Sequence, residues 1–297
     1  MRGLSLDQLR TFVTVVEQGS FSGAARALNL TQPAVSLQLR QLEARLGVRL
    51  LERTGRRILP TMAGQELLEH AGRIEAAVTA AAEAMAEHAT GALGRVRIGT
   101  GGTACIHLLP PILRALKRRL PSLEIVVSTG NTEGILRLLD DNALDLGLVT
   151  LPAPGRAFVV TPLMQEDFVA VAPADQDDLP PLVTPAALVG RPLVLFEPGG
   201  HTRRLVDDWF AAAGISLAPV MSLGSVEAIK ELVGAGLGCA VLPGMAIPPG
   251  SRGLVAHPLA PPLRRQLGLV LRRDKLLTRA LRETIAALHD GTSDATA

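Results

Sequence analysis

Several residue types that particular functions require are scarce in this chain of 297 residues. It contains no tyrosine, one tryptophan and six phenylalanines, so it lacks the aromatic platforms on which single-strand binders stack bases. Its two cysteines, Cys105 and Cys239, lie far apart and fit no metal-binding or redox C-x-x-C spacing. These shortages argue against a single-strand binder, a disulfide scaffold and a zinc protein, and they fit a cytosolic protein with reduced thiols.

Long uninterrupted apolar runs are also missing. The longest charge-free stretch, residues 232–251, contains five glycines and three prolines, which a membrane-spanning helix of about 20 residues would not normally contain. The first twenty residues contain Asp7, Arg10 and Glu17 and are typical of an amphipathic helix rather than a signal peptide. We therefore expect a soluble cytoplasmic protein, and its length predicts two or three domains.

The charge is unevenly distributed, although the net charge is only +2. Residues 1–65 contain nine arginines and four acidic residues, whereas residues 66–90 contain one arginine and five glutamates. Residues 91–297 contain 20 basic and 19 acidic residues. The chain thus has a basic head, an acidic connector and a nearly neutral body. A basic head can be simply a solubilising surface, so its residue pattern has to decide whether it binds DNA.

The head has the pattern of three short helices. Ser5, Ser20 and Thr31 stand where helix N-caps are expected, and Gly19 and Gly47 stand where helices end. Apolar residues at helical spacing predict the buried faces of the first and third helices. These predicted positions are Leu6, Leu9, Val13, Val16, Val35, Leu39, Leu42 and Leu46.

The third predicted helix has a polar face near its N-terminus. Gln32, Ser36 and Arg40 recur every four residues, next to Pro33 and Leu37. Glutamine can pair with adenine and arginine with guanine in the major groove, so this face is typical of a recognition helix. A generic three-helix bundle with a polar outer face is the alternative.

A candidate wing follows the three helices. Arg53 and Arg56 lie on either side of Gly55, a suitable tip for a two-stranded hairpin whose arginines would bind DNA phosphates. This segment favours DNA binding over the generic bundle.

The head resembles the N-terminal signature of LysR-type transcriptional regulators. The similar segments, one of which is Leu30-Thr-Gln-Pro-Ala-Val-Ser36, are residues 6–12, 19–25, 30–36, 41–43, 46–47, 51–53 and 59–64. The resemblance implies a winged helix-turn-helix domain over residues 1–60, with the helix-turn-helix itself from Phe21 to Arg40. It also implies DNA contacts from Gln32, Pro33, Ser36, Arg40 and Arg53, to which the wing argument adds Arg56. Position 37 is often basic in the family and is Leu37 here, so we expect no phosphate or guanine contact from it.

An apolar stripe with heptad spacing follows the head. It consists of Leu67, Ala71, Ile74, Val78, Ala81, Met85 and His88. The spacing predicts a helix over residues 61–90 that pairs with a second copy as a coiled coil. Three heptads are a minimal signal, so packing of the stripe on the chain's own body is the alternative. The LysR resemblance implies the same dimerising linker helix and a homotetramer built as a dimer of dimers.

Beyond residue 90 the pattern changes to alternating strands and helices, which is typical of an α/β domain with a mainly parallel sheet. Strands are expected over residues 95–99, 124–128, 145–150, 168–172, 192–196, 219–223, 239–242 and 266–271. Helices are expected over residues 108–120, 132–142, 203–213, 226–235 and 276–289.

The body resembles the effector domain of LysR-type regulators in residues 109–111, 145–149 and 235–243. The resemblance implies a two-lobed α/β fold like that of periplasmic solute-binding proteins, with an inducer cleft between the lobes. The effector-binding domain would cover residues 91–297, with lobe I formed by residues 91–163 and 265–297 and lobe II by residues 164–264. The chain would cross between the lobes near Leu163 and Arg264.

Small polar residues lie at the predicted strand ends and helix starts of the body. In open α/β sheets, ligands bind at these places, close to helix N-termini. The candidate effector-binding residues are Thr100, Gly102, Thr103, Thr129, Asn131, Thr150, His201 and Thr202. We predict that they bind a small anionic metabolite, although ordinary helix caps use the same residue types.

No pattern indicates catalysis. The run from Gly99 fails the G-x-G-x-x-G motif because Ala104 occupies the last position, and neither GK[ST] nor G-x-S-x-G occurs. The six histidines show no metal-ligand spacing. Cys105 lies at the expected start of a helix, and it is better explained as a structural thiol than as a reactive one. We predict no catalytic residue, metal or cofactor.

We therefore predict a sequence-specific transcriptional regulator. Its expected partners are double-stranded operator DNA, a small-molecule effector, further copies of the chain and, if it is an activator, RNA polymerase. The alternatives are a cytosolic enzyme with a regulatory head, which would need a catalytic constellation, and an architectural DNA binder, which would not need polar strand ends.

Overall fold

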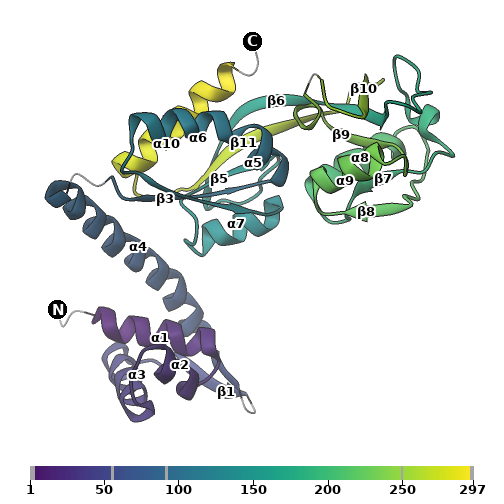
Figure 1. Cartoon of the computed structure of the whole chain (residues 1–297). Coiled ribbons are helices and arrows are strands. Elements are labelled where there is room, and N and C mark those ends of the chain that lie inside the picture. The colour runs from purple at the N-terminus through teal and green to yellow at the C-terminus, as the bar shows by residue number, and fades with distance from the viewer. Residues whose placement is uncertain (1–3, 55–56, 91–92, 249, 295–297) are drawn as a thin grey trace. The chain divides into compact units, whose positions relative to one another are not determined.

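The computed structural model describes residues 4–54, 57–90, 93–248 and 250–294 (Figure 1). The chain divides into two compact units, Met1–Ala82 and Glu83–Ala297. In the described part of the chain, no helix is both long and apolar enough to cross a bilayer.

The first unit contains the three predicted helices, a hairpin and the start of a long helix. Its elements are α1 (Leu6–Gln18), α2 (Phe21–Ala27), α3 (Gln32–Leu46), the antiparallel strands β1 (Leu51–Thr54) and β2 (Arg57–Pro60), and α4 (Met62–Thr90). The side chains of Ser20 and Thr31 cap α2 and α3, whereas that of Ser5 makes no capping hydrogen bond. Gly19 and Gly47 end α1 and α3 in the left-handed conformation, which glycine adopts without strain.

The buried face of α1 is rotated from the predicted one. Leu9, Phe12 and Val15 are buried, while Leu6 is 46% exposed. The prediction was wrong because apolar residues cover about half of the circumference of this helix, which leaves more than one face that could be buried, and Val13 is only partly buried. Phe12 is fully enclosed and forms the centre of a core.

On α3 the predicted apolar face is largely confirmed. Val35, Leu39 and Leu42 are buried, whereas Leu46 at the end of the helix is 37% exposed. Leu39 and Leu42 pack in the same core as Phe12. The three-helix arrangement expected from caps and periodicity is therefore present.

Helix α4 spans Met62–Thr90 and confirms the helix predicted after the head. At its beginning, Ala71 is 3% exposed and Leu67 packs against the core around Phe12. Farther along, Val78 and Met85 are 37% and 62% exposed. The first part of the heptad stripe therefore packs on the head, while Val78 and Met85 farther along it are exposed.

The second unit is built on a seven-stranded sheet in the order β10-β6-β11-β5-β3-β4, with β9 also paired to β6 (Figure 1). The strands are β3 (Arg95–Thr100), β4 (Glu124–Thr129), β5 (Leu146–Thr150), β6 (Phe158–Pro173), β9 (Ala240–Pro243), β10 (Leu254–Pro258) and β11 (Arg264–Arg272). A separate parallel pair consists of β7 (Val194–Phe196) and β8 (Met221–Leu223).

The expectation of a mainly parallel sheet was wrong. Strand β3 pairs in parallel with β4 and β5, but the ladders of β6 with β9, β10 and β11, and of β11 with β5, are antiparallel. The reason is that β6 and β11 are long strands that run side by side in opposite directions. They connect the parts of the sheet that the sequence suggested were separate βαβ units.

The helices of the second unit are α5 (Gly102–His107), α6 (Leu109–Arg119), α7 (Thr132–Asp140), α8 (His201–Ala211), α9 (Val226–Gly234) and α10 (Arg279–Asp294), with short 3-10 turns η1 (Pro185–Leu188) and η2 (Gly244–Ala246). The expected range 108–120 contains α6, and a separate short helix, α5, precedes it and includes Cys105, where the sequence analysis expected a helix to begin. Pro110 and Pro111 lie in the first turn of α6, where a missing N–H has no effect on the helix, so a new helix begins there.

The second unit has separate hydrophobic cores at different positions along the long strands β6 and β11. One core packs α6 and α10 on β3, β5 and β11 and includes Ile98 and Leu116. The other includes Phe168, Trp209 and Val241. Because these cores are separate, we propose that the second unit has two lobes, with the boundaries predicted near residues 163 and 264. We also propose that residues 61–90 form the linker.

Candidate functional site

The predicted recognition face is exposed on α3. Gln32, Pro33 and Arg40 are exposed and Ser36 is partly buried. The Gln32 Nε2 donates to Ser36 Oγ at 3.0 Å, and the Arg40 Nε donates to the Ser36 carbonyl at 3.3 Å. These contacts hold the polar side chains along one side of the helix, beside Leu37, which is 50% exposed.

Buried polar contacts hold α3 in place. The Thr11 hydroxyl on α1 donates to the Gln38 side-chain oxygen, and Glu43 Oε1 accepts a hydrogen bond from the Leu50 amide at 2.8 Å. Thr11 is 2% exposed. Because both partners of each contact are fixed, the exposed face of α3 has a defined orientation on the head.

The two strands expected on either side of Gly55 are present, whereas Gly55 itself lies outside the described residues. Strands β1 and β2 pair antiparallel, from Leu51 opposite Pro60 to Thr54 opposite Arg57. Arg53 lies on β1, but its side chain is outside the described residues, as is Arg56. Their phosphate contacts remain predictions.

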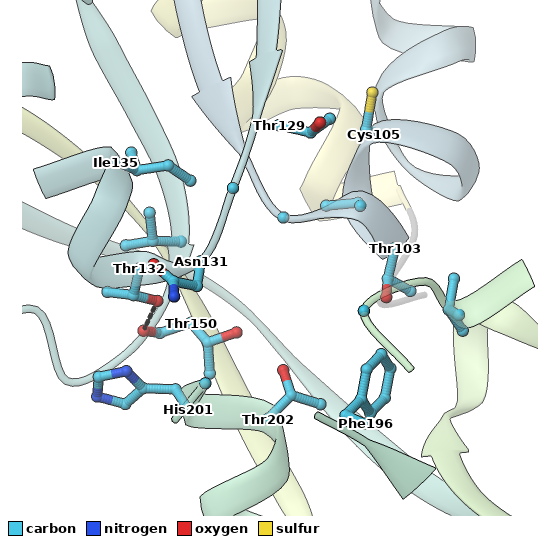
Figure 2. A pocket seen from close by; sticks show the side chains of 18 of the residues that line it. Thr103, Cys105, Thr129, Asn131, Thr132, Ile135, Thr150, Phe196, His201 and Thr202 are labelled. Atoms are coloured by element: carbon cyan, nitrogen blue, oxygen red, sulfur yellow. Dashed lines mark hydrogen bonds between the residues drawn. The ribbon is translucent and has the colours of Figure 1, made fainter. Parts of the chain in front are cut away.

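The second unit contains a cavity of about 510 Å³ (Figure 2). Of the eight predicted effector residues, all but Thr100 line it, namely Gly102, Thr103, Thr129, Asn131, Thr150, His201 and Thr202. They come from the ends of β4 and β5 and from the starts of α5, α7 and α8. Figure 2 shows Thr103, Thr150 and Thr202 around the same space.

Thr100 is the exception. It is the last residue of β3, it is fully buried, and its hydroxyl has no hydrogen-bond partner among the described residues. Alternation along the strand turns its side chain into the core rather than toward the cavity.

Some of the lining residues also act as helix caps, which was the alternative interpretation. Asn131 Oδ1 accepts from the Gly134 amide at 2.8 Å and caps α7. Thr132, which the prediction did not include, donates to the Thr150 carbonyl at 3.2 Å. In contrast, α8 begins after Gly200 without a side-chain cap, so the amides of its first turn keep their donors.

A buried arginine that the sequence analysis missed also lines the cavity. The side chain of Arg265 on β11 is 4% exposed, and its Nε donates to Glu166 Oε2 at 2.6 Å. Its Nη1 lies 3.4 Å from the Thr202 hydroxyl, and its guanidinium carbon lies 5.8 Å from the centre of the Phe168 ring. Its Nη2 is buried and has no hydrogen-bond partner among the described residues.

The other charged groups at the cavity are occupied, exposed or largely neutral. Arg203 donates to the Phe196 carbonyl at 2.6 Å and to Asp207 at 2.8 Å. Burial, assisted by the charge of Arg204, lowers the pKa of His201, which disfavours its protonated form at neutral pH. Glu197 is exposed at the cavity.

A polar contact joins α5 and α9 beside the cavity. His107 Nε2 lies 2.9 Å from Glu227 Oε1, and Lys230 donates to the same carboxylate at 3.0 Å. Burial acts to raise the pKa of Glu227, but the hydrogen bonds from Lys230 and His107 outweigh it and hold the pKa below its usual range. This contact joins the two proposed lobes.

The two thiols are poorly placed for chemistry in the cavity. Cys239 is buried, and burial raises the pKa of its thiol. Cys105 is partly buried at the cavity wall, and Figure 2 shows its sulfur directed away from Thr202. Within the described ranges, no group of three or more metal-ligating side chains could hold a metal ion.

Two family models match the chain. The model described as "Bacterial regulatory helix-turn-helix protein, lysR family" matches residues 6–65, and the "LysR substrate binding domain" matches residues 89–293. The dual regulator OxyR of Escherichia coli is 32% identical over 298 residues, covering 98% of each chain. The regulator CbbR of Rhodospirillum rubrum is 38% identical over 237 residues, 80% of this chain and 78% of that one.

A solved structure is also similar. It is a cysteine-to-serine mutant of Corynebacterium glutamicum OxyR with hydrogen peroxide bound, with a TM-score of 0.62 and 31% identity. The match covers 98% of this chain and 93% of that chain.

Proposed function

Because this chain belongs to the LysR family of DNA-binding transcriptional regulators, which are not enzymes, we propose that its second unit senses a small anionic metabolite in the 510 Å³ cavity. The observation that supports the proposal is that seven predicted residues, six of them polar, line that cavity, although they come from two separate ranges of the sequence, 102–150 and 201–202. A volume of this size is in the usual range for a small-molecule site.

The head supplies the DNA contacts in this proposal. Gln32, Ser36 and Arg40 on the exposed face of α3 read base edges, Pro33 lies beside them, and Arg53 and Arg56 of the hairpin bind phosphates. One recognition helix reads few base pairs alone, so two heads are needed on one operator. The protein acts in the cytoplasm, where the DNA is, and contacts RNA polymerase if it is an activator.

Helix α4 joins two copies in this proposal. Two residues of its apolar stripe, Val78 and Met85, are 37% and 62% exposed. Covering that stripe with the same helix of a second copy removes apolar surface from water. A second pair of copies completes the dimer of dimers.

Thiol oxidation by peroxide is a less suitable function for this chain. A relative of known structure, OxyR of Corynebacterium glutamicum, binds hydrogen peroxide in a mutant that lacks a cysteine. In this chain the two cysteines are Cys105, whose sulfur is directed away from Thr202, and Cys239, whose thiol is buried. A reversibly bound metabolite therefore fits the cavity better than a peroxide-reactive thiol.

The experiment is a metabolite screen followed by two hydroxyl deletions. Carboxylated and phosphorylated metabolites are screened against the full chain by thermal shift, and the hits are measured by calorimetry with wild type, Thr103→Val and Thr202→Val. Each deletion should weaken binding about twofold to tenfold, the effect of one neutral hydrogen bond. Operator binding, measured by footprinting, should stay near wild type.

Thr184→Val is the matched control, because Thr184 caps η1 and does not line the cavity. It should leave effector affinity unchanged. If Thr103→Val and Thr202→Val also leave it unchanged, the effector binds elsewhere and the polar residues are plain helix caps.

A further inference from the structure

We propose that Arg265 selects the charge of the effector, and that its guanidinium receives the single oxyanion group, carboxylate or phosphate, of a ligand that is otherwise uncharged. This inference rests on the proposed function and deepens it, because it names the recognising residue and the ligand group. Arg265 was not among the residues that the sequence suggested.

The first observation is an incomplete hydrogen-bond set. A guanidinium has five N–H donors and is always charged. The Nε of Arg265 is used by Glu166 and its Nη1 by Thr202, while its Nη2 is buried without a partner among the described residues. Buried charged donors in native proteins are normally satisfied, and an oxygen of a ligand in the cavity would satisfy this one.

The second observation is the neighbouring start of α8. Thr202 lies in the first turn of this helix, which has 11 residues and no side-chain cap. The 3.4 Å contact between Arg265 Nη1 and the Thr202 hydroxyl places the guanidinium beside the first turn of α8, whose amides have no side-chain cap. Charged donors and a helix N-terminus that meet in one corner form a site for an oxyanion.

The third observation limits the ligand to one such group. Glu166, 5% exposed, neutralises Arg265 and also accepts from the Met245 amide at 3.0 Å. Arg203 is paired with Asp207, so it offers no second free cation, and the carboxylate of Glu197 adds negative charge. The rest of the lining includes the apolar side chains of Ile135, Leu148, Phe196 and Leu267. A ligand with one oxyanion and an apolar body fits this wall better than a polyanion.

The test uses the full chain and simple probes. Acetate and inorganic phosphate present the oxyanion alone, benzoate adds an apolar body, benzamide is its uncharged counterpart, and citrate is a polyanion. Binding is followed by thermal shift and by fluorescence of Trp209, which is the single tryptophan and is 5% exposed in the second unit. We expect wild type to bind benzoate at least about tenfold more tightly than benzamide, the effect of a charge-assisted hydrogen bond, and citrate no more tightly than acetate. The acetate and phosphate arms show which oxyanion the site prefers.

The decisive readout is the ratio of benzoate to benzamide affinity in variants. Arg265→Gln should reduce this ratio to near one without weakening benzamide, which a purely structural role would not do. Arg264→Gln is the matched control, because Arg264 is the adjacent residue, is 58% exposed and pairs with Asp167 on the surface. It should leave the ratio unchanged.

A second variant covers the case in which Arg265→Gln does not fold. Glu166→Gln removes the neutralising charge but keeps Arg265, so it should tighten benzoate binding several-fold. A structural pair would instead lose binding in both variants. Weakened or unchanged benzoate binding in Glu166→Gln would overturn the inference, as would wild type that binds none of the oxyanion probes.

The outcomes also separate this inference from the proposed function. If benzoate and benzamide bind wild type equally and Thr103→Val weakens both, the cavity is the effector site but Arg265 does not select charge. If a screened metabolite binds and neither Thr103→Val nor Thr202→Val affects it, the proposed function itself is wrong.

Discussion

The carboxylate of Asp145 braces the second unit, and replacing it with asparagine should destabilise that unit at neutral pH. Asp145 is 8% exposed and precedes β5. Its Oδ2 accepts from the backbone amide and Nε of Arg97 at 2.7 and 3.2 Å. Its Oδ1 accepts from Arg97 Nη2 at 3.0 Å and from Lys275 Nζ at 2.6 Å. The contacts connect β3, β5 and the segment before α10.

The expected loss of unfolding free energy follows from these contacts. Breaking a fully buried ion pair by removing one partner costs about 3–5 kcal/mol. Arg97 is one third exposed and Lys275 keeps a hydrogen bond to Asn142 at 2.9 Å, so the loss should be smaller. We expect about 2–3 kcal/mol for Asp145→Asn, which lowers the melting temperature of a unit of this size by about 4–12 °C.

The loss should depend on pH in a defined direction. Burial acts to raise the pKa of Asp145, but the hydrogen bonds and charges of Arg97 and Lys275 outweigh it and lower the pKa below its ordinary value of 3.8. A carboxyl group with a lowered pKa in the folded state stabilises fully above its unfolded pKa, and this stabilisation is lost as the pH falls through the folded pKa. The difference between wild type and Asp145→Asn should therefore be constant at neutral pH and shrink below pH 3.8.

The assay is thermal unfolding of the full chain followed by fluorescence of Trp209, which reports on the second unit. Asp167→Asn is the matched control, since Asp167 forms a surface pair with Arg264, 65% and 58% exposed, worth about 1 kcal/mol or less. Equal melting temperatures for the two variants at neutral pH would refute the bracing role. So would a difference that persists unchanged in acid.

Three further predictions concern the DNA contacts, the assembly and the effector unit. Gln32→Ala should weaken binding to a specific operator by about 1–3 kcal/mol and change binding to random DNA little. Arg53→Ala should weaken binding to both DNAs and reduce the salt dependence of binding by about one phosphate. Fluorescence anisotropy measures both effects. Val78→Asp should dissociate the α4 dimer in sedimentation without unfolding the head, because Val78 is exposed in the single chain; persistent α4 pairing would contradict the linker proposal. His107→Gln should change effector affinity in calorimetry by no more than about fivefold, because the Glu227 partner is partly exposed.

The head could be predicted from the sequence because its determinants are local. Ser20 and Thr31 cap the helices that follow them, and Gly19 and Gly47 end the helices before them, with the hydrogen bonds that these residue types normally make. The buried side of α1 is not local information. It is chosen by contact with α3, and both apolar sides of α1 satisfy helical periodicity.

The sheet could not be predicted to the same extent, because strand direction is decided by pairing between distant segments. Only the end of β6, residues 168–172, was expected as a strand. Its earlier part is mostly exposed or partly buried without regular alternation, and it contains the charged residues Glu166 and Asp167. Such a segment resembles a loop when the partner strand is unknown. Pairing with β11 extends β6 to Phe158–Pro173 and makes this part of the sheet antiparallel.

The same pairing explains why Arg265 was missed and why it matters. In the sequence, Arg264 and Arg265 are two adjacent arginines with nothing to distinguish them. Across the ladder Arg264 lies opposite Asp167, and Arg265 lies opposite Glu166. Neighbouring residues of a strand point to opposite faces of the sheet. The pair of Arg264 and Asp167 is therefore more than half exposed, whereas the side chains of Arg265 and Glu166 are 4% and 5% exposed. Desolvation of the buried pair opposes its own attraction, so stability alone gives little reason for it. A buried ion pair with an unused donor at a cavity is better explained by a ligand that completes it.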